Sequence, residues 1–215
     1  MLLAIDTATN HASIALHDEQ RLRGECTWEA INRHTVTLLP HIREMLAETG
    51  ITPENLSAIA VCRGPGSYTG VRIGLAAAKG IAITRHLPLV GLTTLDILVA
   101  AQPPRPEPLY AVFAAGRRRV GFARYQYGAN QWQAETGVEI VPWTEIVDHI
   151  QTPASIVGEI PPNGLSALKP LGEDIHVPSP AHRLRRAGFL AELAWERLRA
   201  GYHGDPARLD PLYAR

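Results

Sequence analysis

The sequence predicts an α/β protein built from two related lobes. Three observations support this: strand-like apolar runs alternate with helix-length amphipathic segments, the same order of elements occurs twice, and a proline-rich segment separates the two copies. Proline-rich connections interrupt both helices and sheets. We therefore expect an N-terminal lobe at residues 1–102, a linker at 103–108, and a C-terminal lobe with a tail at 109–215.

The N-terminal lobe is expected to hold four strands and two helices. The strands are predicted at Leu2–Thr7, Ala12–His17, Leu22–Thr27 and Ala58–Cys62, and the helices at His34–Thr49 and Leu75–Arg85. Apolar residues of the first helix recur at helical spacing, but Pro40 interrupts them. Because proline removes one intrahelical hydrogen bond, we expect a kink or a later helix start there.

The C-terminal lobe repeats this order. Strands are predicted at Tyr110–Ala115, Arg119–Tyr125, Gln133–Val141 and Ser155–Val157, and helices at Trp143–His149 and Ala187–Ala200. The last stretch, 205–213, is punctuated by proline, which indicates an extended segment that either packs back or reaches a partner.

Composition indicates an ordinary globular protein of the cytoplasm. The 215 residues are 46% hydrophobic, and 21 basic residues balance 21 acidic ones, so the net charge gives no strong attraction to nucleic acid or to a membrane. Asp6 comes too early for a signal peptide, and no apolar run is long enough to span a bilayer. Cys26 and Cys62 form no C-x-x-C pair, and we interpret both as core residues.

A glycine-rich string, Gly64-Pro65-Gly66-Ser67-Tyr68-Thr69-Gly70-Val71-Arg72-Ile73-Gly74, joins a predicted strand to a predicted helix. Glycine permits positive φ or close backbone approach, and Ser67 or Thr69 can cap the helix. Such a helix N-terminus suits an anion, but the same glycines also suit tight packing. The spacing matches neither the P-loop nor the dinucleotide fingerprint.

This string closely resembles the hallmark of the bacterial TsaB (YeaZ) family, whose members take part in making threonylcarbamoyladenosine beside the tRNA anticodon. The resemblance extends to the segments 2–9, 32–40 and 210–215. It implies the fold of actin, Hsp70 and sugar kinases (ASKHA), in which each lobe is a mixed sheet flanked by helices and nucleotide binds between the lobes. In those ATPases the first hairpin lies near phosphate and metal, so Asp6, Thr7 and Thr9 form either a vestigial nucleotide loop or a plain turn.

Comparison with the related transferase TsaD indicates that catalytic groups are missing. TsaD carries a metal-binding H-x-x-x-H, and alignment of the Pro-Leu-Val-Gly lead-in puts Thr94 and Leu98 at those histidines. His34 and His41 either bridge a ligand or are packed, and Ser67 has no neighbouring base. We therefore assign no catalytic residue and no metal.

Two further positions concern function. Ala115 stands where the family usually has the acid of an Asp-Ala-Arg motif, which puts in doubt any role that needs a carboxylate there. The three arginines at 117–119 either meet tRNA phosphate or are simply solvated.

The resemblance implies that the first two long helices dock both a second copy of the chain and TsaD. The interface residues we expect are His34, Leu38, Ile42, Tyr68, Thr69, Arg72, Ile73 and Ala76. TsaE is a further candidate partner, and tRNA is reached through the complex. No cofactor is expected in the isolated chain, and ATP or ADP in the complex is left open.

The expected function is therefore a non-catalytic partner subunit in threonylcarbamoyl transfer. Two alternatives are an independent enzyme, either a glycoprotease-like metallohydrolase or an ATP-using enzyme, and a free-standing nucleotide-sensing homodimer.

Overall fold

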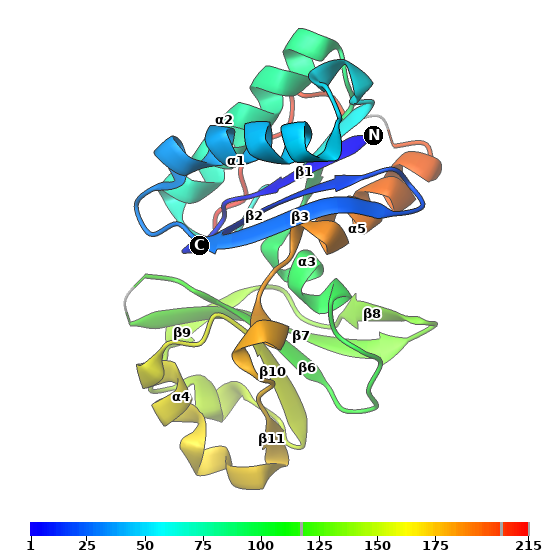
Figure 1. Ribbon diagram of the computed structural model, residues 1–215. Coiled ribbons are helices and arrows are strands. Elements are labelled where there is room, and N and C mark those ends of the chain that lie inside the picture. The colour runs from blue at the N-terminus through cyan, green and yellow to red at the C-terminus, as the bar shows by residue number, and fades with distance from the viewer. Residues whose placement is uncertain (117, 203, 215) are drawn as a thin grey trace. The chain divides into compact units, whose positions relative to one another are not determined.

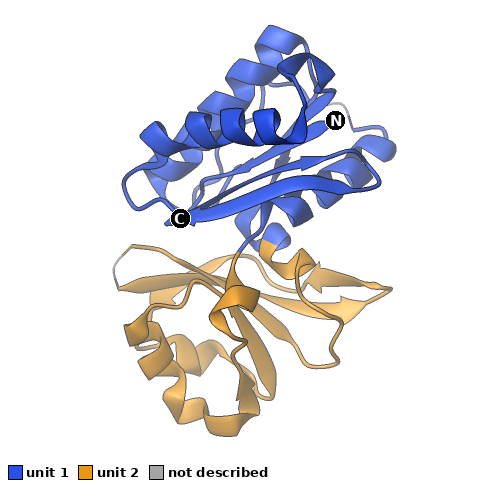
Figure 2. Cartoon of the chain, viewed as in Figure 1, with its two compact units in different colours: residues 1–97, 185–213 blue, residues 98–184, 214–215 orange. Residues whose placement is uncertain are grey.

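The computed structural model describes residues 1–116, 118–202 and 204–214. The chain divides into two compact units (Figure 2): unit 1 comprises residues 1–97 and 185–213, and unit 2 comprises residues 98–184 and 214. Unit 1 is therefore built from both ends of the chain.

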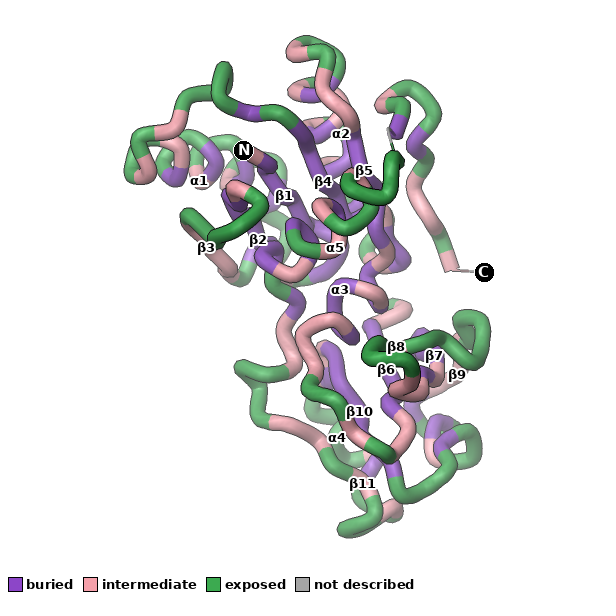
Figure 3. The backbone as a smooth tube through the Cα atoms, turned by 90° about the vertical axis from the view of Figure 1, so that its right-hand side faces the viewer, coloured by how far each residue is buried: buried purple, intermediate pink, exposed green. Residues whose placement is uncertain are grey.

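Unit 1 contains a five-stranded mixed sheet. Its strands are β1 (Leu2–Asp6), β2 (His11–His17), β3 (Leu22–Glu29), β4 (Ala58–Cys62) and β5 (Leu89–Leu92), in the order β3-β2-β1-β4-β5. β1 pairs antiparallel with β2 and parallel with β4. Every residue of β1, β4 and β5 is buried (Figure 3), which explains why these strands, apart from Asp6 at the end of β1, carry no charged or polar side chains rather than alternating ones.

Helices cover both faces of this sheet (Figure 1). α1 (His34–Thr49) and α2 (Tyr68–Arg85) pack on one face, where Leu38 and Leu75 meet Ile59 in one apolar cluster. α5 (Ala187–Arg199) packs on the other face.

The position of α5 differs from the predicted division, which placed it in the C-terminal lobe. Its buried residues include Ala191 and Ala194, which share a cluster with Ala4 and Ala15 of the sheet. Small residues on both sides allow close helix–sheet packing, and this match places the helix in unit 1.

One helix start agrees with expectation and one differs. α1 begins at His34, as predicted, and continues through Pro40, so of the two effects expected from this proline the later helix start does not occur. The carbonyl that loses its partner to Pro40 is that of Val36, and because both residues are exposed, water can satisfy it. α2 begins at Tyr68, directly after the glycine loop, rather than at Leu75.

The sequence did not predict β5, α3 (Thr94–Ala100) or the 3₁₀ turn Pro53–Asn55. β5 is an edge strand, and its outer backbone groups are covered. The Leu89 N–H donates to the Gly204 carbonyl at 3.2 Å, and Arg197 Nη1 donates to the Gly91 carbonyl at 3.0 Å.

Unit 2 repeats the sheet topology of unit 1. Five strands of its six-stranded sheet are β6 (Leu109–Ala114), β7 (Arg119–Gly128), β8 (Gln131–Ala134), β10 (Ala154–Gly158) and β11 (Ile175–His176), in the order β11-β10-β6-β7-β8. β6 pairs antiparallel with β7 and parallel with β10, as β1 does with β2 and β4 in unit 1. The sequence predicted that the order of elements along the chain is repeated. The structure shows this repetition as an equivalent order of strands in the two sheets.

Several elements of unit 2 differ from expectation. The predicted strand 133–141 is two strands, β8 and β9 (Glu139–Pro142), and both pair with β7. The predicted helix 143–149 is reduced to a 3₁₀ turn, Ile146–His149. The unpredicted elements are β11, α4 (Pro162–Leu168) and the 3₁₀ segments Lys169–Asp174 and Pro180–Arg183.

No helix in the described part of the chain is long and apolar enough to cross a membrane.

Candidate functional site

The glycine loop turns the chain from β4 into α2. Ser67 caps the helix, as expected: its Oγ accepts a hydrogen bond from the Gly70 N–H at 3.2 Å. The Ser67 N–H donates to the carbonyl of Ala8 at 2.6 Å. The first turn of α2 is thus joined to the hairpin between β1 and β2.

The glycine loop and the first turns of α2 lie so close to this hairpin that three positions have no room for a Cβ atom. A Cβ on Gly66 would lie 2.1 Å from the Ala8 carbonyl oxygen, and one on Gly74 would lie 2.2 Å from Thr7 Oγ1. A Cβ on Gly70 would meet the Thr7 carbonyl oxygen at 2.2 Å. These contacts account for the glycines through packing, one of the two explanations that the sequence left open.

The hairpin residues Asp6, Thr7 and Thr9 are buried and bonded within the chain. Asp6 Oδ1 accepts the Ala8 N–H, and Asp6 Oδ2 accepts Arg185 Nε, both at 2.8 Å. Arg185 Nη2 donates to Thr9 Oγ1 at 2.6 Å, and Thr7 Oγ1 donates to the Gly70 carbonyl at 2.7 Å. The acid of the predicted nucleotide loop is therefore neutralised by a guanidinium.

Sequence reasoning missed the role of Arg185. Arg185 lies 179 positions after Asp6, just before α5. Nothing in local spacing connects two residues that far apart.

Thr94, aligned with a TsaD histidine, holds the glycine loop. Its N–H donates to the Gly64 carbonyl at 2.9 Å and its Oγ1 donates to the Pro65 carbonyl at 2.5 Å. Cys62 Sγ lies 3.4 Å from Thr94 Oγ1. Burial, with a smaller contribution from the charge of Asp6, raises the pKa of the Cys62 thiol far above its usual range.

The second position aligned with a histidine, Leu98, is fully buried. Within the described residues, no group of three or more His, Cys, Asp and Glu side chains is placed to hold a metal ion.

The predicted interface residues fall into two sets. On α1, His34, Leu38 and Ile42 are buried: the two aliphatic side chains lie in the core, and His34 Nε2 is 2.8 Å from the Thr9 carbonyl oxygen. On α2, Tyr68, Thr69, Arg72 and Ala76 are exposed, whereas Ile73 is half-buried and packs against the apolar core cluster.

Four large apolar residues on the same two helices are exposed: Val36, Leu39, Tyr68 and Ile83, with exposed fractions of 64%, 59%, 58% and 55%. Sequence reasoning predicted Tyr68 as an interface residue and missed the other three. Part of the signal was present on α1, because Leu39 and Leu46 follow the buried Leu38 and Met45 and widen the apolar stripe of this helix.

The remaining candidates have structural surroundings. His41 stacks on Trp28, with ring centroids 4.1 Å apart, and its Nδ1 lies 2.8 Å from the Thr37 carbonyl oxygen. Ala115 lies in the turn between β6 and β7, where its N–H bonds to the Arg119 carbonyl. Arg118 and Arg119 are exposed, and Arg117 lies outside the described residues.

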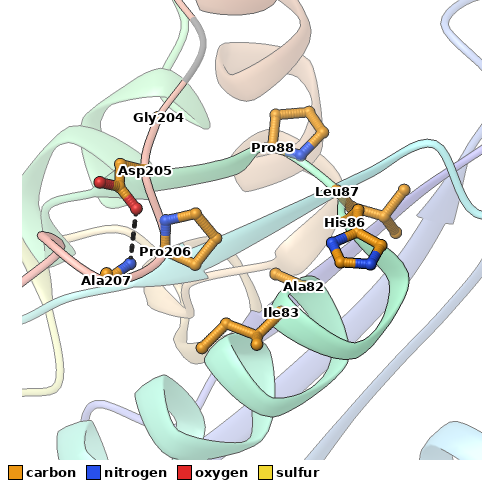
Figure 4. A pocket seen from close by; sticks show the side chains of 9 residues that line it. All are labelled: Ala82, Ile83, His86, Leu87, Pro88, Gly204, Asp205, Pro206 and Ala207. Atoms are coloured by element: carbon orange, nitrogen blue, oxygen red, sulfur yellow. Dashed lines mark hydrogen bonds between the residues drawn. The ribbon is translucent and has the colours of Figure 1, made fainter.

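A pocket of about 480 Å³ lies between the end of α2 and the C-terminal segment (Figure 4). It is lined by Ala82, Ile83, His86, Leu87, Pro88, Gly204, Asp205, Pro206 and Ala207. His86 and Asp205 are its ionisable residues, and Asp205 Oδ1 accepts the Ala207 N–H at 2.8 Å. The lining is otherwise apolar.

Comparison with known proteins gives consistent matches. Residues 12–168 match the family model for TsaD, tRNA N6-adenosine threonylcarbamoyltransferase. The chain is 30% identical to the tRNA threonylcarbamoyladenosine biosynthesis protein TsaB of Bacillus subtilis, over 100% of this chain and 93% of that protein. It is 38% identical to Escherichia coli TsaB, over 68% of this chain and 64% of that protein.

Solved structures agree on the fold. YeaZ from Pseudomonas aeruginosa is 25% identical, with a TM-score of 0.78 and 99% of each chain covered. Component A of (R)-2-hydroxyglutaryl-CoA dehydratase from Acidaminococcus fermentans, 11% identical over 92% of this chain and 98% of that one, has a TM-score of 0.56. The expected fold class, two related lobes of the ASKHA type, is confirmed.

Sequence identity along the whole chain, the repeated sheet order and the glycine loop agree, and the chain belongs to the TsaB (YeaZ) family.

Proposed function

We propose that this chain is a non-catalytic subunit in the formation of N6-threonylcarbamoyladenosine next to the tRNA anticodon, and that it pairs with TsaD. Its relatives from Bacillus subtilis and Escherichia coli are named as tRNA threonylcarbamoyladenosine biosynthesis proteins. The family model that matches residues 12–168 is that of the TsaD transferase, so the chain is related in sequence to the proposed partner. Related subunits commonly pair through equivalent surfaces.

The observation that carries the proposal is an exposed face on α1 and α2, which we call the docking face. It comprises Val36 and Leu39 on α1, with Tyr68, Thr69, Arg72, Ile73, Ala76 and Ile83 on α2. Aromatic, aliphatic and arginine side chains together are typical of protein interfaces, and apolar residues gathered on one face mark such a site.

Two of the expected interface residues on α1 are buried beneath the docking face. Leu38 and Ile42 pack in the core under α1 and so fix its orientation on the sheet. We propose that they contribute by presenting Val36 and Leu39 outward rather than by touching a partner.

A non-catalytic role is supported by the hydrogen bonds that candidate catalytic side chains make within the chain. Asp6 is bound by Arg185, Ser67 caps α2, and Thr94 bonds to the glycine loop. Each of these contacts stabilises unit 1. We propose a homodimer through the docking face for the isolated chain, TsaE as a further candidate partner, and contact with tRNA through the assembled complex.

The experiment is light scattering on size-exclusion fractions of the chain, alone and mixed with its cognate TsaD. We expect a heterodimer for the wild type and its loss in Leu39→Glu and in Ile83→Glu. Leu165→Glu is the matched control, because Leu165 is 39% exposed but lies on α4 of unit 2. We expect this control to bind as the wild type does.

Two results would overturn the proposal. One is a wild-type mixture that forms no complex and shows unchanged threonylcarbamoyl transfer. The other is ATP turnover or a tightly bound stoichiometric metal in the isolated chain, which would favour an independent enzyme.

A further inference from the structure

The C-terminal segment 204–213, which we call the strap, is packed along unit 1. It begins beside β5, where the Gly204 carbonyl accepts the Leu89 N–H. Leu209 is 6% exposed and belongs to the apolar cluster under α1 and α2. A Cβ on Gly91 would lie 2.5 Å from Leu209 Cδ1, so the glycine makes room for this side chain. The strap is therefore anchored in the core.

The strap then reaches the glycine loop. The Leu212 N–H donates to the Arg63 carbonyl at 2.7 Å. Gly64 has a φ of +98°, and a Cβ there would lie 2.4 Å from the Leu212 carbonyl oxygen. Because Gly64 has no side chain, its backbone can adopt a positive φ and the strap can also pass close to it.

These contacts bring Tyr213 to the docking face. Its ring stacks on that of Tyr68, with centroids 5.2 Å apart and planes 26° apart. On α2, the guanidinium of Arg72 lies 4.7 Å from the centroid of the Tyr68 ring and bonds to the Tyr68 hydroxyl. Tyr213, Tyr68 and Arg72 therefore form a stack that joins the end of the chain to the start of α2.

This stack faces solvent. Tyr68 and Tyr213 are 58% and 38% exposed, and Arg72 is exposed as well. Among the described residues no carboxylate forms an ion pair with Arg72. Two exposed rings beside a cation that has no acidic partner in the described part of the chain match the residue types that dominate binding at interface centres.

We propose that the strap is a built-in part of the docking face and that Tyr213 is a contact residue for the protein partner. This inference rests on the proposed function, because the partner is the TsaD subunit named there. The stack holds Tyr68 in one orientation before binding, so less side-chain freedom is lost when the complex forms. The partner surface should present an apolar patch to the two rings and a carboxylate to Arg72.

The test is the dissociation constant of the complex with cognate TsaD, measured by isothermal titration calorimetry. We expect Tyr213→Ala to weaken binding at least tenfold and Tyr213→Phe to remain within twofold, since the ring alone makes the stack. Leu165→Ala, an equally exposed side chain on α4, should also stay within twofold. The unfolding midpoint of Tyr213→Ala should match the wild type, because Leu209 still anchors the strap.

Hydrogen exchange gives a second readout. On complex formation, backbone amides at 212–213 and at 68–72 should become protected together. Wild-type binding with Tyr213→Ala equally tight, or protection at 68–72 without any at 212–213, would overturn this inference and leave the proposed function standing. A wild-type chain that does not bind TsaD at all would overturn both.

Discussion

Arg185 Nε lies 2.8 Å from Asp6 Oδ2, and the two side chains are 3% and 1% exposed. The pair joins the first hairpin to the residue that returns the chain to unit 1. A buried charge that loses its partner is costly, whereas an exposed ion pair contributes little.

This contrast gives the first prediction. Arg185→Gln should lower the free energy of unfolding by about 3–5 kcal/mol, because it leaves the Asp6 carboxylate buried without its counter-charge. Arg208→Gln is the matched control: Arg208 and its partner Asp205 are 90% and 52% exposed, so the loss of this pair should cost about 0–1 kcal/mol. Urea unfolding curves of the two variants measure the difference. Equal losses would contradict the importance of the buried pair.

Two glycines of α2 should respond oppositely to alanine. Gly74→Ala should destabilise by about 1–3 kcal/mol, because the added Cβ would lie 2.2 Å from Thr7 Oγ1, whose hydroxyl is bonded to the Gly70 carbonyl. Gly80→Ala should stabilise by about 0.5–1 kcal/mol, since nothing lies within 4 Å and alanine favours a helix. The thermal unfolding midpoints of both variants test this prediction. A stabilising effect of Gly74→Ala would contradict the close approach of Thr7 to this glycine.

The buried thiol of Cys62 should make stability fall at alkaline pH. Its pKa is raised in the folded state by burial and, to a smaller extent, by the charge of Asp6, so the unfolded chain releases this proton first. Stability from this group is full below the unfolded pKa, about 9, and declines above it by up to about 1.4 kcal/mol per pH unit. Urea unfolding from pH 7 to 10 should show a steeper decline for the wild type than for Cys62→Ala. Parallel curves would contradict the prediction.

Neighbouring leucines of α1 separate folding from association. Leu38 is 1% exposed, so Leu38→Ala should cost about 2–5 kcal/mol of stability. Leu39 is 59% exposed, so Leu39→Ala should change stability by less than about 0.5 kcal/mol. Sedimentation equilibrium should nevertheless show weaker self-association for Leu39→Ala. The idea fails if Leu39→Ala unfolds the chain or if it leaves association untouched.

Much of the fold could be predicted from the sequence. The apolar runs of β1 and β4, the boundaries of α1 and the cap at Ser67 follow from local periodicity and hydrogen-bonding preference, which act over a few residues. Short elements were missed: β5 has four residues and β11 has two, and so few positions cannot establish a period.

The sequence predicted only part of the candidate site. The glycine string was visible, but the sequence allowed both an anion site and close packing, and distances to Ala8 and Thr7 were needed to explain the glycines. The sequence also placed Leu38 in the interface where Leu39 is the exposed residue. Both fall on an apolar stripe, and only the position of the sheet decides which one it covers.

The sequence by itself determined the two-lobed α/β plan, the longer strands and helices and the family, because these depend on local pattern and on residue identity along the whole chain. The tertiary structure decided that α5 returns to unit 1, that Arg185 neutralises Asp6, and that Tyr213 stacks on Tyr68. These relationships join residues more than 140 positions apart, and such contacts are selected by packing and burial in three dimensions, to which spacing along the chain gives no guide.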